Sequence, residues 1–420
     1  MNLSFPIFAT MLLRLSIFLL FALVIELYAY QAIRTTFENK WIIRFYTVFS
    51  VLTVVFLVFS FSRFDRTVGQ NPSTLMTIGL LLLVYVPKLL IGVFMLFEDV
   101  FRVVFGLINY FTDSAESNSF LPSRRKFISQ MALVVAFIPF SGLIYGIFKG
   151  RYNYKVIKTP IYFDDLPDEF DGFKILQISD LHCGSFDNKE KIQYGVDLIN
   201  QQDFDILVFT GDLVNTHAEE MDEWYDVFSK IKQGKFGNYS ILGNHDYGEY
   251  IKWPSYKDKQ RNFEGIKSIH PKIGWDLLLN EHRIIKKGNS EIALIGVENW
   301  GAKFQQKADL AKAIRGVDKN AFKVVLTHDP SHWDLVLQND PFNYHLTLCG
   351  HTHGMQFGIE IPGWIKWSPV QYVYKHWAGL YEKGKRYIYV NRGFGYHAYP
   401  GRVGIWPEIT ILELKKKQIS

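Results

Sequence analysis

The sequence predicts an α/β domain that is preceded by about four transmembrane helices. The first 150 residues contain long apolar stretches, each close to the ~20 residues that cross a bilayer as a helix. The remaining chain alternates short runs rich in Ile and Val with polar segments of helical periodicity. We therefore expect a membrane domain over residues 1–150, a linker over 151–171 and an α/β domain over 172–416.

The apolar stretches that we expect to span the membrane cover residues 7–30, 41–62, 75–97 and 128–148. The first is too long for a cleavable signal peptide, and no clean small-residue cleavage site follows it. A shorter run at 100–111 fits an amphipathic helix at the membrane interface. Lys88 lies within the third stretch, but no row of intramembrane charges accompanies it, which favours an anchor over a transporter.

Lysines and arginines between the stretches predict the orientation of the chain. The loops before the second and fourth stretches are richer in these residues than the loop before the third, so we place both in the cytoplasm. The pair Arg124-Arg125 resembles a twin-arginine export signal, although plain positive charge at the cytoplasmic end of a helix explains it equally. Both interpretations put the α/β domain on the extracytoplasmic face of the cell membrane.

Composition excludes several classes of protein. The net charge of +5 is mild and no arginine-rich run with interleaved aromatics occurs, so we do not expect a nucleic-acid partner. Only two cysteines, Cys183 and Cys349, are present, which excludes a disulfide scaffold and a thiolate zinc site. Two interpretations stay open for this pair: small buried residues, or a disulfide between the loops that carry them.

Five short motifs follow the ends of predicted strands in the α/β domain. They are Asp180-Leu181-His182, Gly211-Asp212, Gly243-Asn244-His245-Asp246, Thr327-His328-Asp329 and Gly350-His351-Thr352-His353-Gly354. The preceding strands are expected at 173–178, 206–210, 239–242, 323–327 and 346–348. Because ligands gather at the carboxyl ends of strands in such sheets, we expect these side chains to meet at one edge of the fold.

The donor types in these motifs indicate two divalent metal ions. Neighbouring cations repel each other, and a carboxylate that bridges them lowers that cost. A mixture of imidazole and carboxylate ligands suits manganese, iron or zinc better than calcium. The sequence therefore predicts a two-metal hydrolase.

The motifs resemble those of the calcineurin-like metallophosphoesterases, in the same order and at compatible spacing. The resemblance covers roughly residues 173–414, and Val390–Gly395 with Pro407-Glu408-Ile409 extends it to the membrane-anchored YkuE-type bacterial subgroup. It implies the calcineurin-like phosphoesterase fold, in which two packed β-sheets are flanked by helices. It also implies a metal-dependent hydrolase that acts on phosphoric ester or pyrophosphate bonds.

The same resemblance implies a role for each site residue. Asp180, His182 and His353 would hold one metal, Asn244, His328 and His351 would hold the second, and Asp212 would bridge them. His245 would contact the phosphate and assist the leaving group, with Asp246 orienting it. In the 392–402 loop, Arg392 and Arg402 are either phosphate clamps or structural ion pairs, and His397 is a further candidate for the substrate site.

The expected reaction is hydrolysis of a phosphomonoester, phosphodiester or pyrophosphate by a hydroxide that bridges the two metals. Attachment to a membrane is consistent with a lipid-linked or cell-envelope substrate. Clustered aromatic residues at 361–377 are either a core segment or an amphipathic, membrane-facing edge. The alternatives to a phosphoesterase are a membrane sensor or transporter whose outer domain binds phosphate compounds and, less compatible with the histidine of the third motif, an amidohydrolase.

Overall fold

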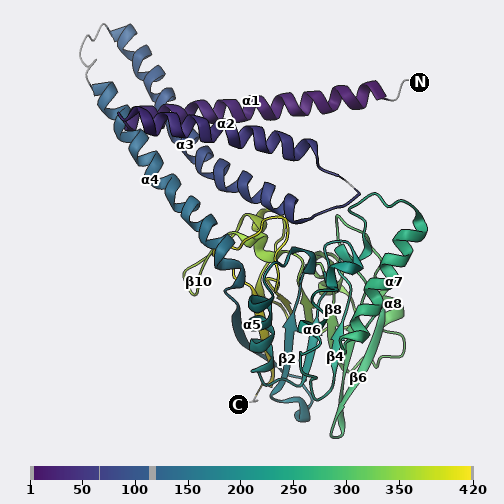
Figure 1. Cartoon of the computed structure of the whole chain (residues 1–420). Helices are drawn as coiled ribbons and strands as arrows, with labels where there is room; N and C mark the ends of the chain where they lie inside the picture. The colour runs from purple at the N-terminus through teal and green to yellow at the C-terminus, as the bar shows by residue number, and fades with distance from the viewer. Residues whose placement is uncertain (1–3, 66, 113–119, 418–420) are drawn as a thin grey trace. The chain divides into compact units, whose positions relative to one another are not determined.

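The structure, a computed structural model, describes residues 4–65, 67–112 and 120–417 (Figure 1). The chain divides into two compact units. The helical unit comprises Met1–Phe64 and Thr77–Ile144, and the α/β unit comprises Asp65–Met76 and Tyr145–Ser420. The loop between the second and third helices and the last turn of the fourth helix therefore belong to the α/β unit.

The helical unit is built from four helices. They are α1 (Ser4–Thr36), α2 (Lys40–Ser62), α3 (Pro72–Thr112) and α4 (Phe120–Phe148). Among the described residues, α2, α3 and α4 are long and apolar enough to cross a membrane, with mean hydropathies of 2.3, 2.4 and 2.2. The separate interfacial helix expected at 100–111 is wrong, because α3 continues to Thr112 and an ion pair of Glu98 with Arg102 (2.9 Å) spans the expected break.

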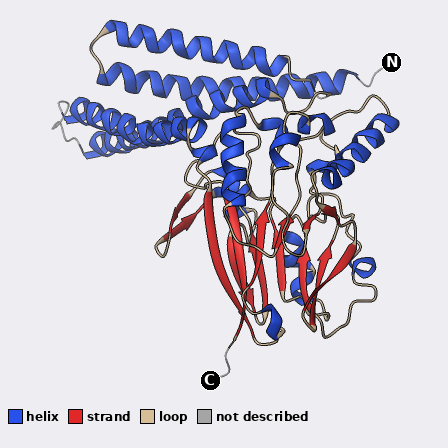
Figure 2. Cartoon of the chain, turned by 60° about the horizontal axis from the view of Figure 1, so that its bottom comes forward, coloured by secondary structure: helices blue, strands red, loops and turns tan. Residues whose placement is uncertain are grey.

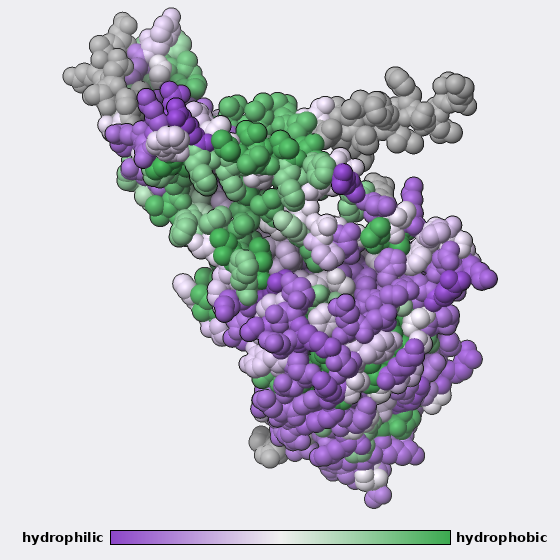
Figure 3. Space-filling model, viewed as in Figure 1, coloured by the Kyte–Doolittle hydropathy of each residue, from purple (hydrophilic) through white to green (hydrophobic). Residues whose placement is uncertain are grey.

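Charged side chains inside the helical unit are paired. Lys88 of α3 donates hydrogen bonds to Glu26 of α1 at 2.7 Å and to Ser50 of α2 at 2.8 Å. Arg125 of α4, one of the twin arginines, pairs with Asp99 of α3 at 2.6 Å. Apolar side chains gather on the surface of these helices, as Figure 3 shows. Charges that are paired beneath an apolar exterior, as Lys88 and Glu26 are, are typical of a membrane-spanning bundle.

Two six-stranded sheets form the α/β unit (Figure 2). The first has the order β1 (Lys155–Phe163), β14 (Glu408–Lys416), β2 (Phe173–Ile178), β3 (Ile206–Phe209), β4 (Asn238–Ser240) and β5 (Asp276–Leu277). The second has the order β12 (Gly379–Lys383), β13 (Arg386–Val390), β9 (Leu346–Cys349), β8 (Phe322–Leu326), β7 (Ser290–Gly296) and β6 (Glu281–Lys287).

The two sheets pack face to face through a fully buried apolar layer. Ile175 of the first sheet and Leu294 of the second belong to this one cluster. Helices α5 (Lys189–Asn200) and α7 (Tyr256–Lys272) cover the outer face of the first sheet, and α9 (Ser331–Leu335) covers that of the second. The predicted fold of two packed sheets flanked by helices is confirmed.

The linker expected over 151–171 is wrong, because this segment contains β1. Its residues pair in parallel with β14, from Lys155 opposite Glu408 to Phe163 opposite Lys416. Pro160 argues against a strand in the sequence, since proline cannot donate to a ladder. β1 lies at the edge of its sheet, where one side of the strand needs no ladder bonds and proline is tolerated.

Candidate metal centre

The loops after five strands bring the predicted ligands to one edge of the two sheets. Asp180 and His182 follow β2, Asp212 follows β3, Asn244 follows β4, His328 follows β8, and His351 and His353 follow β9. Strands β2, β3 and β4 run parallel, as do β8 and β9, so their carboxyl ends share an edge. All of these ligands are buried except His351, which is half-buried.

The backbone of these loops is strained at most of the ligand positions. Left-handed φ angles occur at Asp180 (52°), His182 (50°), Asp212 (61°), His351 (72°) and His353 (49°). Such conformations cost roughly 1–3 kcal/mol each for residues with side chains and persist where the surrounding structure imposes them. Only four other non-glycine residues in the described chain share this feature. The concentration of strain at this edge indicates a functional site.

Asp180, His182 and His353 form the first cluster. The Nε2 atoms of His182 and His353 lie 3.1 Å apart, and Oδ1 of Asp180 lies 3.3 Å from Nε2 of His353. Each of the three residues offers a ligand atom within 4.8 Å of the other two. This spacing suits three ligands of one cation.

Asp212, His328 and His351 form the second cluster. Oδ2 of Asp212 lies 3.1 Å from Nε2 of His328, which in turn lies 3.2 Å from Nδ1 of His351. The same Oδ2 lies 3.6 Å from Nε2 of His182 in the first cluster. One carboxylate oxygen is therefore within reach of both clusters, which is what a carboxylate that bridges two cations requires.

Asn244 supplies an unsatisfied oxygen to the same edge. Its Nδ2 donates to the hydroxyl of Tyr250 at 2.6 Å, while its Oδ1 is buried and accepts no hydrogen bond from the described residues. A buried carbonyl oxygen without a hydrogen-bond partner costs about 1–3 kcal/mol of stability. The unpartnered Oδ1 of Asn244 is therefore better explained as a ligand of a metal ion than as a polar atom buried among apolar groups. With two carboxylates and four imidazoles beside it, this donor set fits two divalent transition-metal ions.

The electrostatics of the edge favour positive charge. Burial lowers the pKa of His328, but the carboxylates of Asp212 and Asp180 outweigh burial and raise that pKa to about 10. Burial also opposes ionisation of Asp212, yet the neighbouring imidazoles hold its pKa well below the usual range. The site thus stabilises a cation among its carboxylates.

His245 lies beside the first cluster. Its ring centroid is 4.9 Å from that of His182, and its backbone amide donates to Oδ1 of Asp212 at 2.8 Å. Its Nδ1 lies 2.8 Å from the backbone oxygen of Asn215. Because a carbonyl can only accept, Nδ1 carries the proton in this contact and Nε2 is the ring atom available to a substrate.

Asp246, which the sequence analysis expects to orient His245, binds backbone amides and forms no hydrogen bond with the His245 ring among the described residues. It accepts hydrogen bonds from Asp212 at 3.0 Å, Leu213 at 2.8 Å and Gly243 at 2.9 Å. Burial raises the pKa of Asp246 to about 7, against the effect of these donors. Asp246 therefore fixes the two loops that carry Asp212 and His245.

His397, a candidate substrate residue from the sequence, lies within the same histidine group. Its ring centroid is 4.4 Å from that of His245 and 4.6 Å from that of His182. Its backbone amide donates to Oε1 of Gln356 at 2.6 Å. His182, His245 and His397 also offer ring nitrogens within 4.8 Å of one another.

The two candidate arginines are engaged by the protein itself. Arg392 is buried and forms ion pairs with Glu360 and Glu408, which is the structural alternative to a phosphate clamp. Arg402 is fully buried, and its Nη2 lies 3.2 Å from Nδ1 of His353. Arg402 therefore packs behind a predicted metal ligand.

Asn215 is a site residue that the sequence analysis missed. Its Oδ1 lies 3.1 Å from Nδ1 of His182 and 3.2 Å from Nδ1 of His397. A second contact to a ligand imidazole fixes the orientation of the ring. The only signal in the sequence is the position of Asn215 three residues after Asp212, in the same strand-end loop.

Two further residues contact His351 and were not predicted to do so. The hydroxyl of Tyr374 lies 2.8 Å from Nε2 of His351, and Oδ2 of Asp329 lies 3.5 Å from the same atom. Asp329 is adjacent to His328 in its motif, which is a weak signal. Tyr374 comes from a distant segment and carries no motif.

The two cysteines are free and buried. Sγ of Cys183 lies 3.4 Å from Sδ of Met221, and Sγ of Cys349 donates to the backbone oxygen of Tyr389 at 3.6 Å. The alternative of a Cys183–Cys349 disulfide is wrong, because each thiol packs into a different part of the core.

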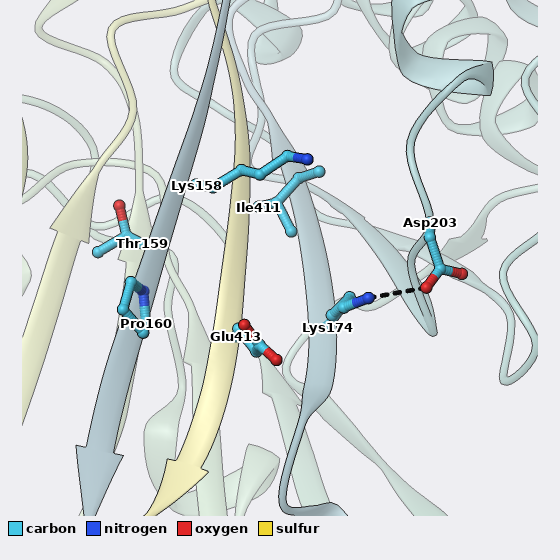
Figure 4. A pocket seen from close by; sticks show the side chains of 7 residues that line it. All are labelled: Lys158, Thr159, Pro160, Lys174, Asp203, Ile411 and Glu413. Carbon is cyan, nitrogen blue, oxygen red and sulfur yellow. Dashed lines mark hydrogen bonds and ion pairs between the residues drawn. The ribbon is translucent and has the colours of Figure 1, made fainter.

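The pocket in Figure 4 is separate from the histidine-rich edge. It is lined by Lys158, Thr159, Pro160, Lys174, Asp203, Ile411 and Glu413. Lys174 and Asp203 pair across it at 2.8 Å. Its lining contains none of the predicted ligands, so the candidate chemistry belongs to the strand-end loops.

Two family models match the chain. Residues 173–355 match the calcineurin-like phosphoesterases, and residues 11–151 match a model described as a probable calcineurin-like phosphoesterase transmembrane domain. The two sheets, the strand-end ligands and the apolar helices define the class as a membrane metallophosphoesterase. The chain belongs to the calcineurin-like phosphoesterase family, and it carries a transmembrane domain.

Three relatives illustrate this membership. An uncharacterized metallophosphoesterase of Helicobacter pylori strain J99 is 29% identical, over 76% of this chain and 80% of the relative. The uncharacterized metallophosphoesterase YkuE of Bacillus subtilis is 29% identical, over 60% of this chain and 82% of the relative. Phosphodiesterase YaeI of Escherichia coli is 29% identical, over 70% of this chain and 99% of the relative.

Proposed function

We propose that the chain is a membrane-anchored phosphoesterase that uses two divalent metal ions. Asp180, His182 and His353 would hold one ion, Asn244, His328 and His351 the other, and Asp212 would lie between them. The observation that carries this proposal is the Asp212 carboxylate, 3.6 Å from Nε2 of His182 and 3.1 Å from Nε2 of His328. When bound, manganese, zinc or iron ions would supply Lewis acidity to a phosphoryl oxygen and acidify a water molecule.

His245 is the residue that we assign to the substrate. Its Nδ1 is held by the backbone oxygen of Asn215, so the ring is oriented before a substrate arrives. With both ring nitrogens protonated, its Nε2 would donate a hydrogen bond to a phosphoryl oxygen and pass that proton to the departing oxygen, which leaves a neutral ring protonated at Nδ1. His397 offers a second imidazole next to it.

The substrate class in this proposal is a phosphomonoester, phosphodiester or pyrophosphate. The name of the E. coli relative, a phosphodiesterase, supports a diester. The transmembrane domain supports a lipid-linked or cell-envelope substrate. The excess of Lys and Arg in the loops before the second and fourth helices supports an extracytoplasmic position for the α/β unit.

A panel of phosphoesters assayed with manganese, zinc and iron tests the activity. We expect metal-dependent hydrolysis of an aryl phosphodiester or monoester by the purified full chain, and loss of that hydrolysis in Asp212→Ala. Binding of phosphate compounds without turnover under every metal would instead support the sensor or transporter alternative. Protease treatment of intact cells tests the orientation, because an extracytoplasmic α/β unit is cleaved and a cytoplasmic one is protected.

A further inference from the structure

A short hairpin follows the His351–Gly354 motif and projects from the sheets of the α/β unit (Figures 1 and 2). It consists of β10 (Ile359–Ile361) and β11 (Ile365–Trp367), which pair in antiparallel register. Directly opposed residues of such a pair share one face. One face therefore carries three isoleucines and Trp367, and the other carries Glu360 opposite Lys366.

Both charged residues of this hairpin bond to the protein, although Glu360 is half-buried and Lys366 stays exposed. Glu360 accepts a hydrogen bond from Nε of Arg392 at 3.0 Å, and the Lys366 ammonium donates to the backbone oxygen of Ala378. A hairpin in water normally buries its apolar face and exposes its charges. Here Ile359 and Ile361 are exposed although Glu360 beside them is half-buried, which favours an apolar environment next to the two isoleucines.

The apolar face is exposed over a continuous part of the hairpin. The exposed fractions are 50% for Ile359, 43% for Ile361 and 77% for Trp364 at the turn. Tyr372 and Val373, in the turns that follow β11, are also exposed. Neighbouring exposed apolar side chains of this size mark an interaction surface, and a tryptophan at the tip favours a membrane–water interface.

The base of the hairpin is connected to the end of an apolar helix through residues 402 and 403, all within the α/β unit. The amide of Gly358 donates to the oxygen of Val403 at 2.9 Å, and the amide of Arg402 donates to the oxygen of Gly146 at 3.2 Å. Gly146 lies in the last turn of α4, which belongs to the α/β unit. A side chain at Gly146 would lie 2.9 Å from the oxygen of Arg402, so the contact is tight.

That last turn is where a membrane-spanning helix ends. The apolar segment of α4 runs over Ser123–Phe148 with a mean hydropathy of 2.2, and Lys149 follows it, exposed. Phe148 is itself 69% exposed. A helix that ends in an exposed phenylalanine and a lysine leaves the bilayer at the interface. The hairpin is thus connected, through Val403 and Arg402, to the last turn of α4.

We infer that the β10–β11 hairpin docks into the interfacial layer of the bilayer that α4 spans. Trp364 and the exposed isoleucines contact lipid, and the ion pair of Glu360 with Arg392 keeps the hairpin rigid on the α/β unit. This contact adds a second attachment to the membrane besides the helices. It also fixes the orientation of the strand-end loops relative to the lipid surface.

The docked hairpin also narrows the substrate class, a step that rests on the proposed phosphoesterase function. The chain runs from His353 into β10 through Met355, which is half exposed. An exposed apolar side chain between the hairpin and the ligand loop suits a phosphoester that carries a hydrocarbon tail. A substrate held in the bilayer is therefore expected to depend on the hairpin, whereas a small water-soluble phosphoester is not.

A spin label at the hairpin tip tests the docking without any activity. The full chain carrying Trp364→Cys is labelled and placed in nanodiscs of phosphatidylcholine and phosphatidylglycerol, one chain per disc. Tyr162→Cys is the matched control, because Tyr162 is a 50% exposed aromatic near the far end of β1. Cys183 and Cys349 are buried, and the unsubstituted chain checks that they remain unlabelled.

We expect the label at 364 to collide with oxygen more often than with a water-soluble nickel chelate, and the label at 162 to show the opposite preference. Equal exposure of both labels to the nickel chelate would overturn the docking. Protection of position 364 only when two chains share a disc would also overturn it, because a second copy would then cover the hairpin.

Hydrolysis by a hairpin variant then tests the substrate consequence. Trp364→Ser combined with Ile361→Ser is expected to lower hydrolysis of a vesicle-embedded, long-chain phosphodiester about 10-fold and to leave that of a soluble aryl phosphodiester unchanged. Tyr162→Ser should change neither. An equal effect on both substrates would contradict the substrate consequence, whereas no hydrolysis by the unsubstituted chain would contradict the proposed function and leave the spin-label result standing.

Discussion

The carboxylate of Asp246 accepts a hydrogen bond from the backbone amide of Asp212 at 3.0 Å, and no contact joins it to the ring of His245 among the described residues. Asp246 also binds the amides of Leu213 and Gly243, so one buried side chain ties together two ligand loops. Its function is therefore to place the Asp212 carboxylate, whose backbone is in the left-handed region.

Asp246→Asn is expected to weaken metal binding. The amide group would turn an N–H toward at least one backbone N–H, which cannot accept it. Residues that support metal ligands in this way typically contribute 10–100-fold in affinity or activity, so we expect a loss of about that size that excess metal partly restores. Calorimetric titration with manganese measures the affinity. Unchanged affinity with lost activity would contradict a role through Asp212.

His245→Gln is expected to retain metal and to lose turnover. General acid catalysis contributes typically 10²–10⁴-fold, and it matters most when the leaving group is a poor one. We therefore expect kcat to fall by about that factor for phenyl phosphodiesters and by less for nitrophenyl phosphodiesters. An equal loss for both leaving groups would mean that His245 binds the substrate without donating a proton.

His270 makes the stability of the α/β unit sensitive to acid. Its ring is fully buried with both nitrogens unpartnered among the described residues, and burial lowers its pKa to about 3. Because the pKa is lower in the folded chain than the ~6.5 of an unfolded one, the unfolded chain takes up the proton first. Stability is therefore lost as pH falls below about 6.5, by about 2 kcal/mol at pH 5.

His270→Phe removes this titration and fills a similar volume. We expect the midpoint of thermal unfolding in detergent to rise for the variant, and to rise more at pH 5 than at pH 8. The gain at pH 8 reflects only the removal of two unpartnered polar atoms, each worth about 1–3 kcal/mol when buried. The same gain at both pH values would show that the ring is not kept neutral by burial.

Lys88 and Glu26 depend on each other within the helical unit. Their side chains meet at 2.7 Å with little exposure. Removing one member of a buried pair leaves the other charge buried without a partner and lowers the free energy of unfolding by about 3–5 kcal/mol, while replacing both members can be nearly neutral. Lys88→Met is therefore expected to lower the unfolding midpoint in detergent, and adding Glu26→Gln should restore most of it. A double variant less stable than the single one would mean that the charges act separately.

The meeting of the candidate ligand side chains at one edge of the fold was predictable because their sequence signal is local. Each ligand lies in a motif at the end of an apolar run, so residue type and position together predict a shared edge of the fold. The strained φ angles at Asp180 and His353 leave no such trace, since they are imposed by packing between loops. The contacts of Asp246 leave no trace in the sequence for the same reason: its partner amide at Asp212 is 34 residues away.

The strands were more predictable in the centre of the sheets than at the edges. The central strand β3 is a continuous apolar run, and β8 is apolar apart from Lys323, because both faces of each strand are buried. The edge strand β1 contains Pro160 and half-exposed residues, which resemble a linker. In the β10–β11 hairpin, alternation fixes which residues share a face, but only the structure shows that Ile359 and Ile361 are exposed while Glu360 bonds to Arg392.

The number of metal ions bound per chain tests the central claim most directly. The full chain, purified in detergent and loaded with manganese or zinc, is assayed by elemental analysis together with Asp212→Asn. Two ions per folded chain are expected, with fewer in the variant because Asp212 lies within reach of both clusters. A folded chain that binds no metal above background, or a variant that retains both ions at full affinity, would contradict the account.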